Sequence, residues 1–211
     1  MTVMISRAGA PASGLPVGRP RSATAHRAIV EAAVALFVEA GLEGASVEAV
    51  AARAGVGKAT IYRRWRSKED LVVDAVIQVF AEPVRPDTGS VREDLVRCAR
   101  ELQELMTTSP SGEVFPRMVA EVARGSVLGR LYGERVAAPR RGVLAEAIAR
   151  GVQRGELPSS VDAELLVDVL VGTLLLRRIQ GGLAGSSPGR AESVVDLLLA
   201  GLLADQHVAQ E

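Results

Sequence analysis

The sequence predicts an all-α protein, in which an N-terminal three-helix domain with a helix-turn-helix precedes a larger helical domain. Apolar residues recur at spacings of three and four along most of the chain, and no segment shows the apolar–polar alternation of a convincing strand. Glycine or proline separates the successive helical runs. With 48% hydrophobic and only 3% aromatic residues, the chain can build a sizeable core that consists mainly of Leu, Val and Ala.

Charge is distributed unevenly along the 211 residues, although the formal net charge is zero. Residues 1–70 contain ten Lys and Arg against six Asp and Glu, which leaves a net +4 in this third and −4 in the remainder. This concentration of basic residues favours double-stranded DNA as a partner of the N-terminal part.

Few residues suit catalysis or metal binding. The two histidines, His26 and His207, lie in no metal-ligand spacing, and the chain has neither a Ser/His/Asp pattern nor a glycine-rich phosphate loop. The lone Cys98 excludes a disulfide framework and is consistent with a reducing, cytoplasmic location. We therefore expect a protein that is not an enzyme and has no metal and no cofactor.

The chain is expected to begin with a disordered tail, because residues 1–18 lack a sustained apolar segment and contain several Gly and Pro. Arg19 and Arg21 follow as a basic arm that either contacts the DNA minor groove and phosphates or is merely solvated. The first helix is expected from about Thr24 to Ala40, where one face is apolar, and should end at Gly41.

Residues 45–71 have the pattern of a helix-turn-helix. The apolar residues of 47–54 recur at i, i+3, i+4 and i+7, and Ser46 precedes them as a helix cap. Residues 55–57, Gly-Val-Gly, then predict a sharp turn. In the next helix Ile61 can pack inward, which directs the neighbouring Lys, Thr, Tyr and Arg side chains outward as groups suited to base edges and phosphates.

A further helix is expected to start at Ser67, with Asp70 completing a shortened capping box. Lys68 opposes the dipole of that helix at a cost of about 0.3 to 1 kcal/mol, which a bound phosphate would offset.

The same segment resembles the DNA-binding core of the TetR (tetracycline repressor) family. The residues that carry the resemblance are Ser46, Val50-Ala51, Ala54-Gly55-Val56, Thr60, Tyr62, Trp65, Lys68-Glu69 and Leu71. Two positions depart from the family pattern. Gly57 stands where the family usually has a serine, so a hydroxyl group is missing there, and Trp65 replaces the commoner phenylalanine. The resemblance covers about residues 19 to 75.

The resemblance implies a domain division and a set of DNA contacts. Residues 19–68 would form the DNA-binding domain and residues 69–211 the effector-binding and dimerisation domain. The implied DNA contacts are Ser46, Lys58, Thr60, Tyr62, Arg63, Arg64, Trp65 and Lys68, with Arg19 and Arg21 from the arm. For Trp65 the alternative is packing against the first and fourth helices, and for Arg63 and Arg64 it is solvated charge.

Helical spacing continues through the rest of the chain. The expected segments are 68–81, which links the two domains, then a loop at 83–89, and helices at 90–106, 113–124, 127–152, 162–179 and 194–203. Gly133 and Pro139 should kink or split the segment 127–152.

The last two helices are apolar on nearly every side, so each must be covered on more than one face. A membrane span is excluded because Asp168 interrupts an apolar run that is already too short. We expect a four-helix bundle between two protomers, the dimer of the resembling family, with a large intramolecular core as the alternative. The expected interface residues are Leu166, Val169, Leu170, Thr173, Val195, Leu198, Leu199 and Leu202.

The resemblance also implies a ligand pocket in the C-terminal domain. The candidates for its lining are Met106, Phe115, Met118, Val122, Tyr132 and Ile148, each of which is otherwise ordinary core. An apolar lining suits a hydrophobic or amphipathic small molecule as the effector. The expected function is a homodimeric repressor that binds a pseudo-palindromic operator and is released by this effector. The alternatives are an activator and a protein-interaction module without effector control.

Overall fold

The computed structural model describes residues 19–108, 110–181 and 190–208, and among them the side chains of 23–108, 110–181 and 190–202. The described part of the chain is helical and contains no β-strand, as the sequence predicts. Its elements are α1 (Arg19–Gly44), α2 (Val47–Ala54), α3 (Lys58–Tyr62), α4 (Lys68–Val79), α5 (Val91–Thr107), α6 (Ser111–Ala123), α7 (Val127–Tyr132), the π-helical turn η1 (Gly133–Ala137), α8 (Ala138–Gln153), α9 (Ala163–Gly181) and α10 (Arg190–Val208). The predicted tail, residues 1–18, lies outside the described residues.

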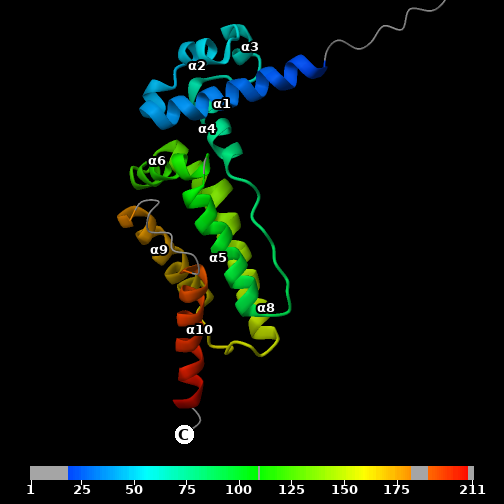
Figure 1. Cartoon of the computed structure of the whole chain (residues 1–211), viewed down its shortest axis with the longest axis vertical. Helices are drawn as coiled ribbons and strands as arrows, with labels where there is room; N and C mark the ends of the chain where they lie inside the picture. The colour runs from blue at the N-terminus through cyan, green and yellow to red at the C-terminus, as the bar shows by residue number, and fades with distance from the viewer. Residues whose placement is uncertain (1–18, 109, 182–189, 209–211) are drawn as a thin grey trace, which may run out of the picture.

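Helices α1 to α3 form one end of an elongated molecule, and the end of α10 lies at the other (Figure 1). Helix α1 packs against α2 and α4, and its buried residues include Ile29 and Phe37. Gly41 kinks α1 with φ 69°, a left-handed conformation that glycine adopts without steric cost.

The structure corrects the predicted start of the first helix. Arg19 begins α1, whereas the sequence placed Arg19 and Arg21 in an arm before a helix starting near Thr24. Pro20 is compatible with this earlier start because the first turn of a helix requires no amide donor.

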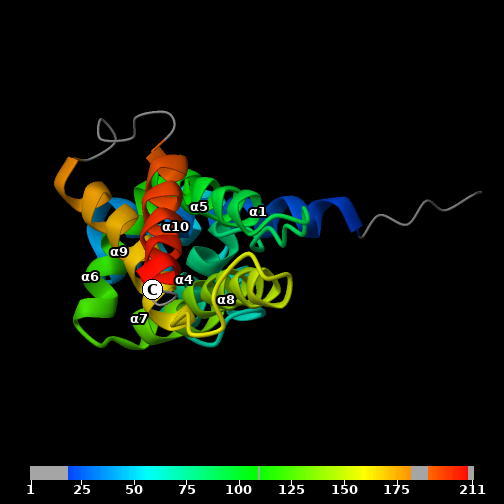
Figure 2. The same ribbon diagram turned by 90° about the horizontal axis from the view of Figure 1, so that it is seen from below.

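The C-terminal domain extends away from this end. Helices α5 and α8 pack side by side, α9 packs against both, and α10 packs against α5 and α9 (Figures 1 and 2). Helix α4 reaches this domain through contacts with α7, while it also packs against α1. Among the described residues, no helix is long and apolar enough to cross a membrane.

The predicted interruption between residues 127 and 152 is confirmed, and it is a π-helical turn. Helix α7 ends at Tyr132, η1 spans Gly133–Ala137, and Pro139 lies in the first turn of α8, where its missing amide proton costs nothing. Both Gly133 and Ala137 line a partly open cavity described below.

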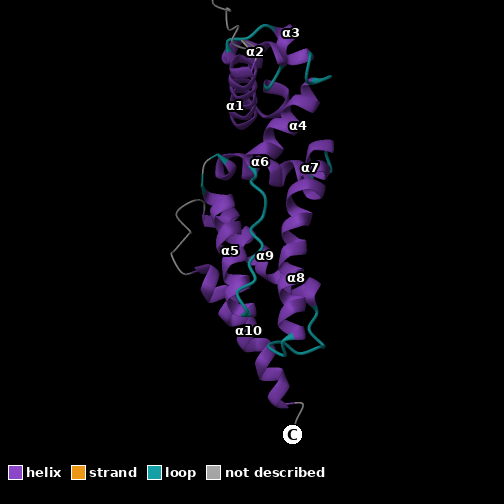
Figure 3. Ribbon diagram, turned by 90° about the vertical axis from the view of Figure 1, so that its right-hand side faces the viewer, coloured by secondary structure: helices purple, strands orange, loops and turns teal. Residues whose placement is uncertain are grey.

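A long extended segment, residues 81–90, connects α4 to α5 and runs along the C-terminal domain (Figure 3); we call it the strap. The Arg150 guanidinium donates to the Pro86 carbonyl over 2.7 Å. The Thr88 amide and hydroxyl each donate to the buried Asp94 carboxylate over 2.8 Å. Burial opposes ionisation of Asp94, but the bonds from Thr88 and Arg150 outweigh it and lower the pKa of this carboxyl below its ordinary value.

Candidate nucleic-acid interface and internal cavity

Helices α2 and α3 have the predicted helix-turn-helix geometry. The Ser46 hydroxyl caps α2 by accepting a hydrogen bond from the Ala49 amide over 3.2 Å. Gly55 ends α2 in the left-handed region with φ 65°, which turns the chain toward α3. Ile61 is fully buried, so it fixes α3 against the domain and leaves the remaining face of this short helix outward.

The outward face of α3 carries hydrogen-bonding and cationic groups. Tyr62 is 54% exposed, Lys58 and Arg63 are exposed, and Thr60 is half-buried. Arg64, which follows, is also exposed. This combination matches the chemistry of base edges and phosphates, and it lies at the end of the molecule farthest from the C-terminus (Figure 1).

Two cations near this face are paired with carboxylates. Lys58 Nζ lies 3.0 Å from Glu48 Oε1 on α2, and this hydrogen bond raises the pKa of the Lys58 ammonium. Lys68 Nζ lies 3.2 Å from Glu43 Oε2 on α1. Ser67 caps α4 through the Asp70 amide, as predicted. A phosphate bound by either lysine would take the place of a protein carboxylate.

Trp65 does not belong to this surface, which corrects its predicted DNA contact. Its side chain is 6% exposed, its ring stacks on His26 with centroids 5.4 Å apart, and its indole nitrogen donates to Asp74 Oδ2 over 3.0 Å. The indole therefore packs between α1 and α4, the alternative that the sequence left open.

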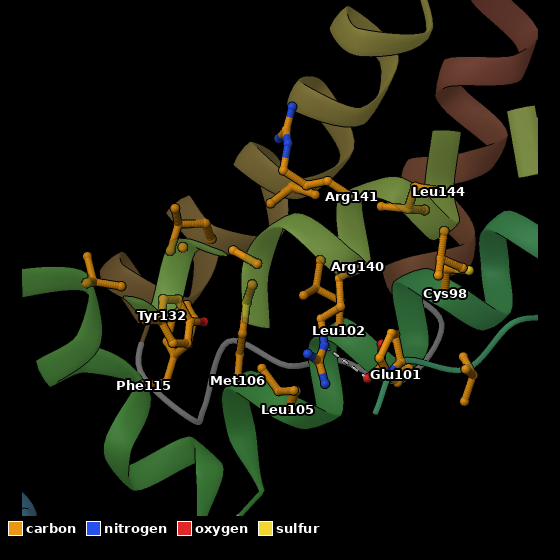
Figure 4. Close-up of a pocket in the computed structure, with 18 of the residues that line it drawn as sticks. Cys98, Glu101, Leu102, Leu105, Met106, Phe115, Tyr132, Arg140, Arg141 and Leu144 are labelled. Atoms are coloured by element: carbon orange, nitrogen blue, oxygen red, sulfur yellow. Dashed lines mark hydrogen bonds and ion pairs between the residues drawn. The ribbon is translucent and has the colours of Figure 1, made fainter. Parts of the chain in front are cut away.

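The C-terminal domain contains a partly open cavity of about 230 Å³ between α5, α6, η1 and α8 (Figure 4). Four of the six predicted ligand residues line it: Met106, Phe115, Val122 and Tyr132. Met118 and Ile148 do not line it, which corrects two predictions, because both are fully buried in the core.

The polar groups of the cavity wall were not predicted from the sequence. Arg140 is only 7% exposed, and its guanidinium lies 3.2 Å from Glu101 Oε1. Burial raises the pKa of Glu101, and Arg140 opposes that rise. Burial also raises the pKa of Tyr132 to about 12, so its phenol is protonated at neutral pH. An arginine beside a proline at a helix start carries no local signal of burial, and this ion pair joins residues on different helices.

The apolar residues that α9 and α10 expose are not the ones that the sequence predicted for the dimer interface. Four predicted residues are buried within the protomer, which corrects their assignment: Leu166, Leu170, Val195 and Leu199. Val169 is 40% exposed, and Thr173, Leu198 and Leu202 are half-buried. Among the described side chains of these helices, the most exposed apolar ones are Leu165, Leu176, Ile179 and Leu197.

Two family models match the chain. Residues 29–75 match the model "Bacterial regulatory proteins, tetR family", and residues 85–198 match "Tetracyclin repressor-like, C-terminal domain". The chain belongs to the TetR family. It is therefore a TetR-family transcriptional regulator, and this family is not enzymatic. TetR-family regulators bind DNA as dimers.

Individual relatives agree with this assignment. The chain is 34% identical to the HTH-type transcriptional regulator YdeS of Bacillus subtilis (strain 168) over 167 residues, 78% of this chain and 83% of the relative. It is 30% identical to the DNA-binding transcriptional repressor TetR of Mycobacteroides abscessus over 165 residues, 77% of this chain and 86% of the relative. The fold is similar to that of AibR in complex with isovaleryl coenzyme A and operator DNA, with a TM-score of 0.58, 24% identity and coverage of 84% of this chain and 97% of AibR.

The described residues contain no group of three or more His, Cys, Asp or Glu that could hold a metal ion.

Proposed function

We propose that this TetR-family regulator is a homodimeric repressor that binds a pseudo-palindromic operator and is released by a small molecule held in the cavity. The observation that carries the proposal is a set of hydrogen bonds that join the walls of the cavity to the DNA-binding end. The repressor name of the M. abscessus relative, which is 30% identical, supports repression.

On the DNA side, the outward face of α3 would enter the major groove. Thr60 and Tyr62 are suited to base edges or sugar-phosphate oxygens, and Lys58 to a phosphate. Helix α3 has only five residues, so one copy reads a short half-site. A second copy, related by a two-fold axis, would read the other half-site about 34 Å away.

The second copy would pack on the outer face of α9 and α10. Leu165, Leu176 and Ile179 of α9 and Leu197 of α10 are all more than half exposed, and a group of exposed apolar side chains marks an interaction site. Pairing these helices with their symmetry mates forms a four-helix bundle and removes the exposed apolar area from water.

One bond joins a cavity wall to the DNA-binding end directly, and another joins a cavity wall to the segment just after α4. Arg140 of the cavity wall donates to the Ala81 carbonyl, just beyond the end of α4. On α6, Phe115 and Val119 face the cavity, whereas Arg117 donates over 2.6 Å to the Val38 carbonyl of α1. A ligand that shifts α6 or α8 would therefore shift α1 and α4 with them.

A ligand with a higher affinity for the shifted conformer depletes the conformer that fits the operator. Linkage makes the effect reciprocal, so operator DNA lowers the affinity for the ligand by the same factor. A coupling of about 1 to 3 kcal/mol is typical for such pairs of sites.

Fluorescence anisotropy on duplexes tiled across the DNA beside the protein's own gene tests the proposal, with scrambled duplexes as controls and a salt series. We expect one site with two protomers per duplex, preferred by about 10³ or more over scrambled DNA. Equal, salt-sensitive binding to every duplex would contradict operator recognition, because it reports only non-specific phosphate contacts.

A further inference from the structure

We propose that the effector of this cavity is a compact molecule without net charge, aromatic or branched aliphatic, rather than a carboxylate, a phosphate ester or an amine. The inference rests on the proposed function in one respect, namely that the cavity is the effector site. It is carried by the size of the cavity and by the pairing of every charged group in its described lining.

The size of the cavity and its walls favour a small apolar ligand. Its volume of about 230 Å³ is below the roughly 300 to 1,000 Å³ of sites that hold drug-sized molecules. The walls consist mainly of aliphatic and aromatic side chains, which Figure 4 shows around the central space. They include Leu102, Leu105, Met106, Phe115, Val119 and Leu144.

Arg140 is not available to an anionic ligand. Its guanidinium lies 3.2 Å from Glu101 Oε1, donates over 3.1 Å to the Val136 carbonyl, and also donates to the Ala81 carbonyl. An anion that drew Arg140 away would leave the Glu101 carboxylate without its partner in a largely buried position, which is strongly unfavourable.

Arg141 is directed elsewhere. Its guanidinium lies 2.7 Å from Asp168 Oδ1 on α9, and in Figure 4 it points away from the apolar groups of the cavity. Its aliphatic stem therefore contributes to the cavity wall, while its guanidinium pairs with Asp168 outside the cavity. No other cation lies among the cavity-lining residues of the described chain, so an acyl chain with a polyphosphate head lacks a partner here.

A cationic ligand is disfavoured for the opposite reason. The carboxylate of Glu101 is already paired with Arg140, and a second cation would face that guanidinium across a cavity of low polarity. The remaining titratable groups of the lining are neutral at pH 7, because burial raises the pKa of Cys98 to about 11 and that of Tyr132 to about 12. An uncharged molecule disturbs none of these pairs and fills the apolar space.

The test uses three competitors with the same naphthalene ring: 1-naphthalenemethanol, 1-naphthoate and 1-naphthylmethylammonium. Each competitor is titrated into the full-length protein at pH 7 with the neutral fluorescent probe N-phenyl-1-naphthylamine bound, and displacement of the probe is measured. We expect one saturable probe site per protomer, and the alcohol should displace the probe at a concentration at least tenfold lower than either ion.

Two variants locate the probe and test the role of the ion pair. Val119→Phe should fill the cavity and abolish probe binding, whereas the matched Val127→Phe, on an exposed valine outside the cavity, should leave it unchanged. Glu101→Gln leaves the Arg140 charge without a counter-charge, so the affinity for 1-naphthoate should rise at least tenfold with little change for the alcohol.

Three results would overturn the inference: no saturable probe binding, probe binding that survives Val119→Phe, or equal displacement by 1-naphthoate and the alcohol. Operator anisotropy with the probe at saturation separates this inference from the proposed function. If the neutral ligand occupies the cavity but leaves operator affinity unchanged, effector control fails, while the preference of the cavity for uncharged ligands stands.

Discussion

The polar side chains of α3 and of the start of α4 fall into two chemical kinds. The Thr60 hydroxyl can both donate to and accept from a base edge, whereas Lys58 and Lys68 are point charges that suit phosphate oxygens. Base contacts depend on the DNA sequence and phosphate contacts do not, so substitutions can tell them apart.

Thr60→Ala should change the order of preference among operator variants, because it removes a hydrogen-bonding group from the groove. Lys68→Ala should weaken binding to all sequences to a similar extent and reduce the salt slope by about one, because it removes one phosphate contact. Anisotropy titrations on a panel of operator variants, at several salt concentrations, measure both effects. The reverse pattern would mean that the two roles are exchanged.

Glu48→Gln should strengthen binding to scrambled DNA about threefold, because it removes the carboxylate that pairs with Lys58 and repels phosphate. Glu134→Gln, on the π-helical turn next to the cavity, is the matched control and should have little effect. An unchanged affinity for Glu48→Gln would show that Lys58 contributes little at the DNA surface.

At the scale of the elements, the contacts of the strap are the feature that the sequence predicts least well. The sequence predicts a loop at residues 83–89, but the anchors of that loop lie on α5 and α8. Because the strap follows α4 directly, its attachment fixes the end of the helix that joins the two domains. Asp94 holds this attachment from the first turn of α5.

Asp94→Asn should lower the free energy of unfolding at pH 7 by about 2 kcal/mol, since it weakens a buried, charge-assisted set of hydrogen bonds. The native pKa of Asp94 is lowered, so its contribution is present above the unfolded value of about 4 and is lost as the pH falls through the native pKa. Urea denaturation at pH 7 and pH 3 should therefore show a difference between variant and parent that shrinks at the lower pH. A constant difference would contradict this assignment.

At the scale of the whole molecule, the elongated shape places α3, the proposed recognition helix, at one end (Figure 1). The exposed apolar side chains of α9 and α10 belong to the C-terminal domain. One protomer therefore presents a single recognition helix, and two are needed to read a pseudo-palindrome. Leu170, which the sequence placed in the interface, is 2% exposed and belongs to the protomer core, so a charge there would disturb the fold itself.

Leu197→Glu should convert the proposed dimer to a monomer, because it places a charge on the most exposed of the described apolar side chains that the partner would cover. Sedimentation equilibrium measures the mass, and circular dichroism checks that the helices persist. Val127→Glu, a charge on an equally apolar exposed residue of α7, should leave the mass unchanged. A dimeric mass for Leu197→Glu would place the interface elsewhere.

The sequence by itself determined the all-α class, most helix boundaries and the helix-turn-helix, because these features depend on residues within four positions of one another. The Ser46 and Ser67 caps, the Gly55 turn and the inward Ile61 are of this kind. The same local rules could not say which apolar residues meet a cavity, a partner or the core.

Only the tertiary structure decided those roles, because burial depends on contacts between distant segments. It placed Trp65, Met118 and Leu170 in the core and left Leu197 outside. It also brought Arg140 to Glu101 across 39 positions of sequence and to Ala81 across 59. No periodicity encodes such pairs, since they arise only when separate helices pack into one core.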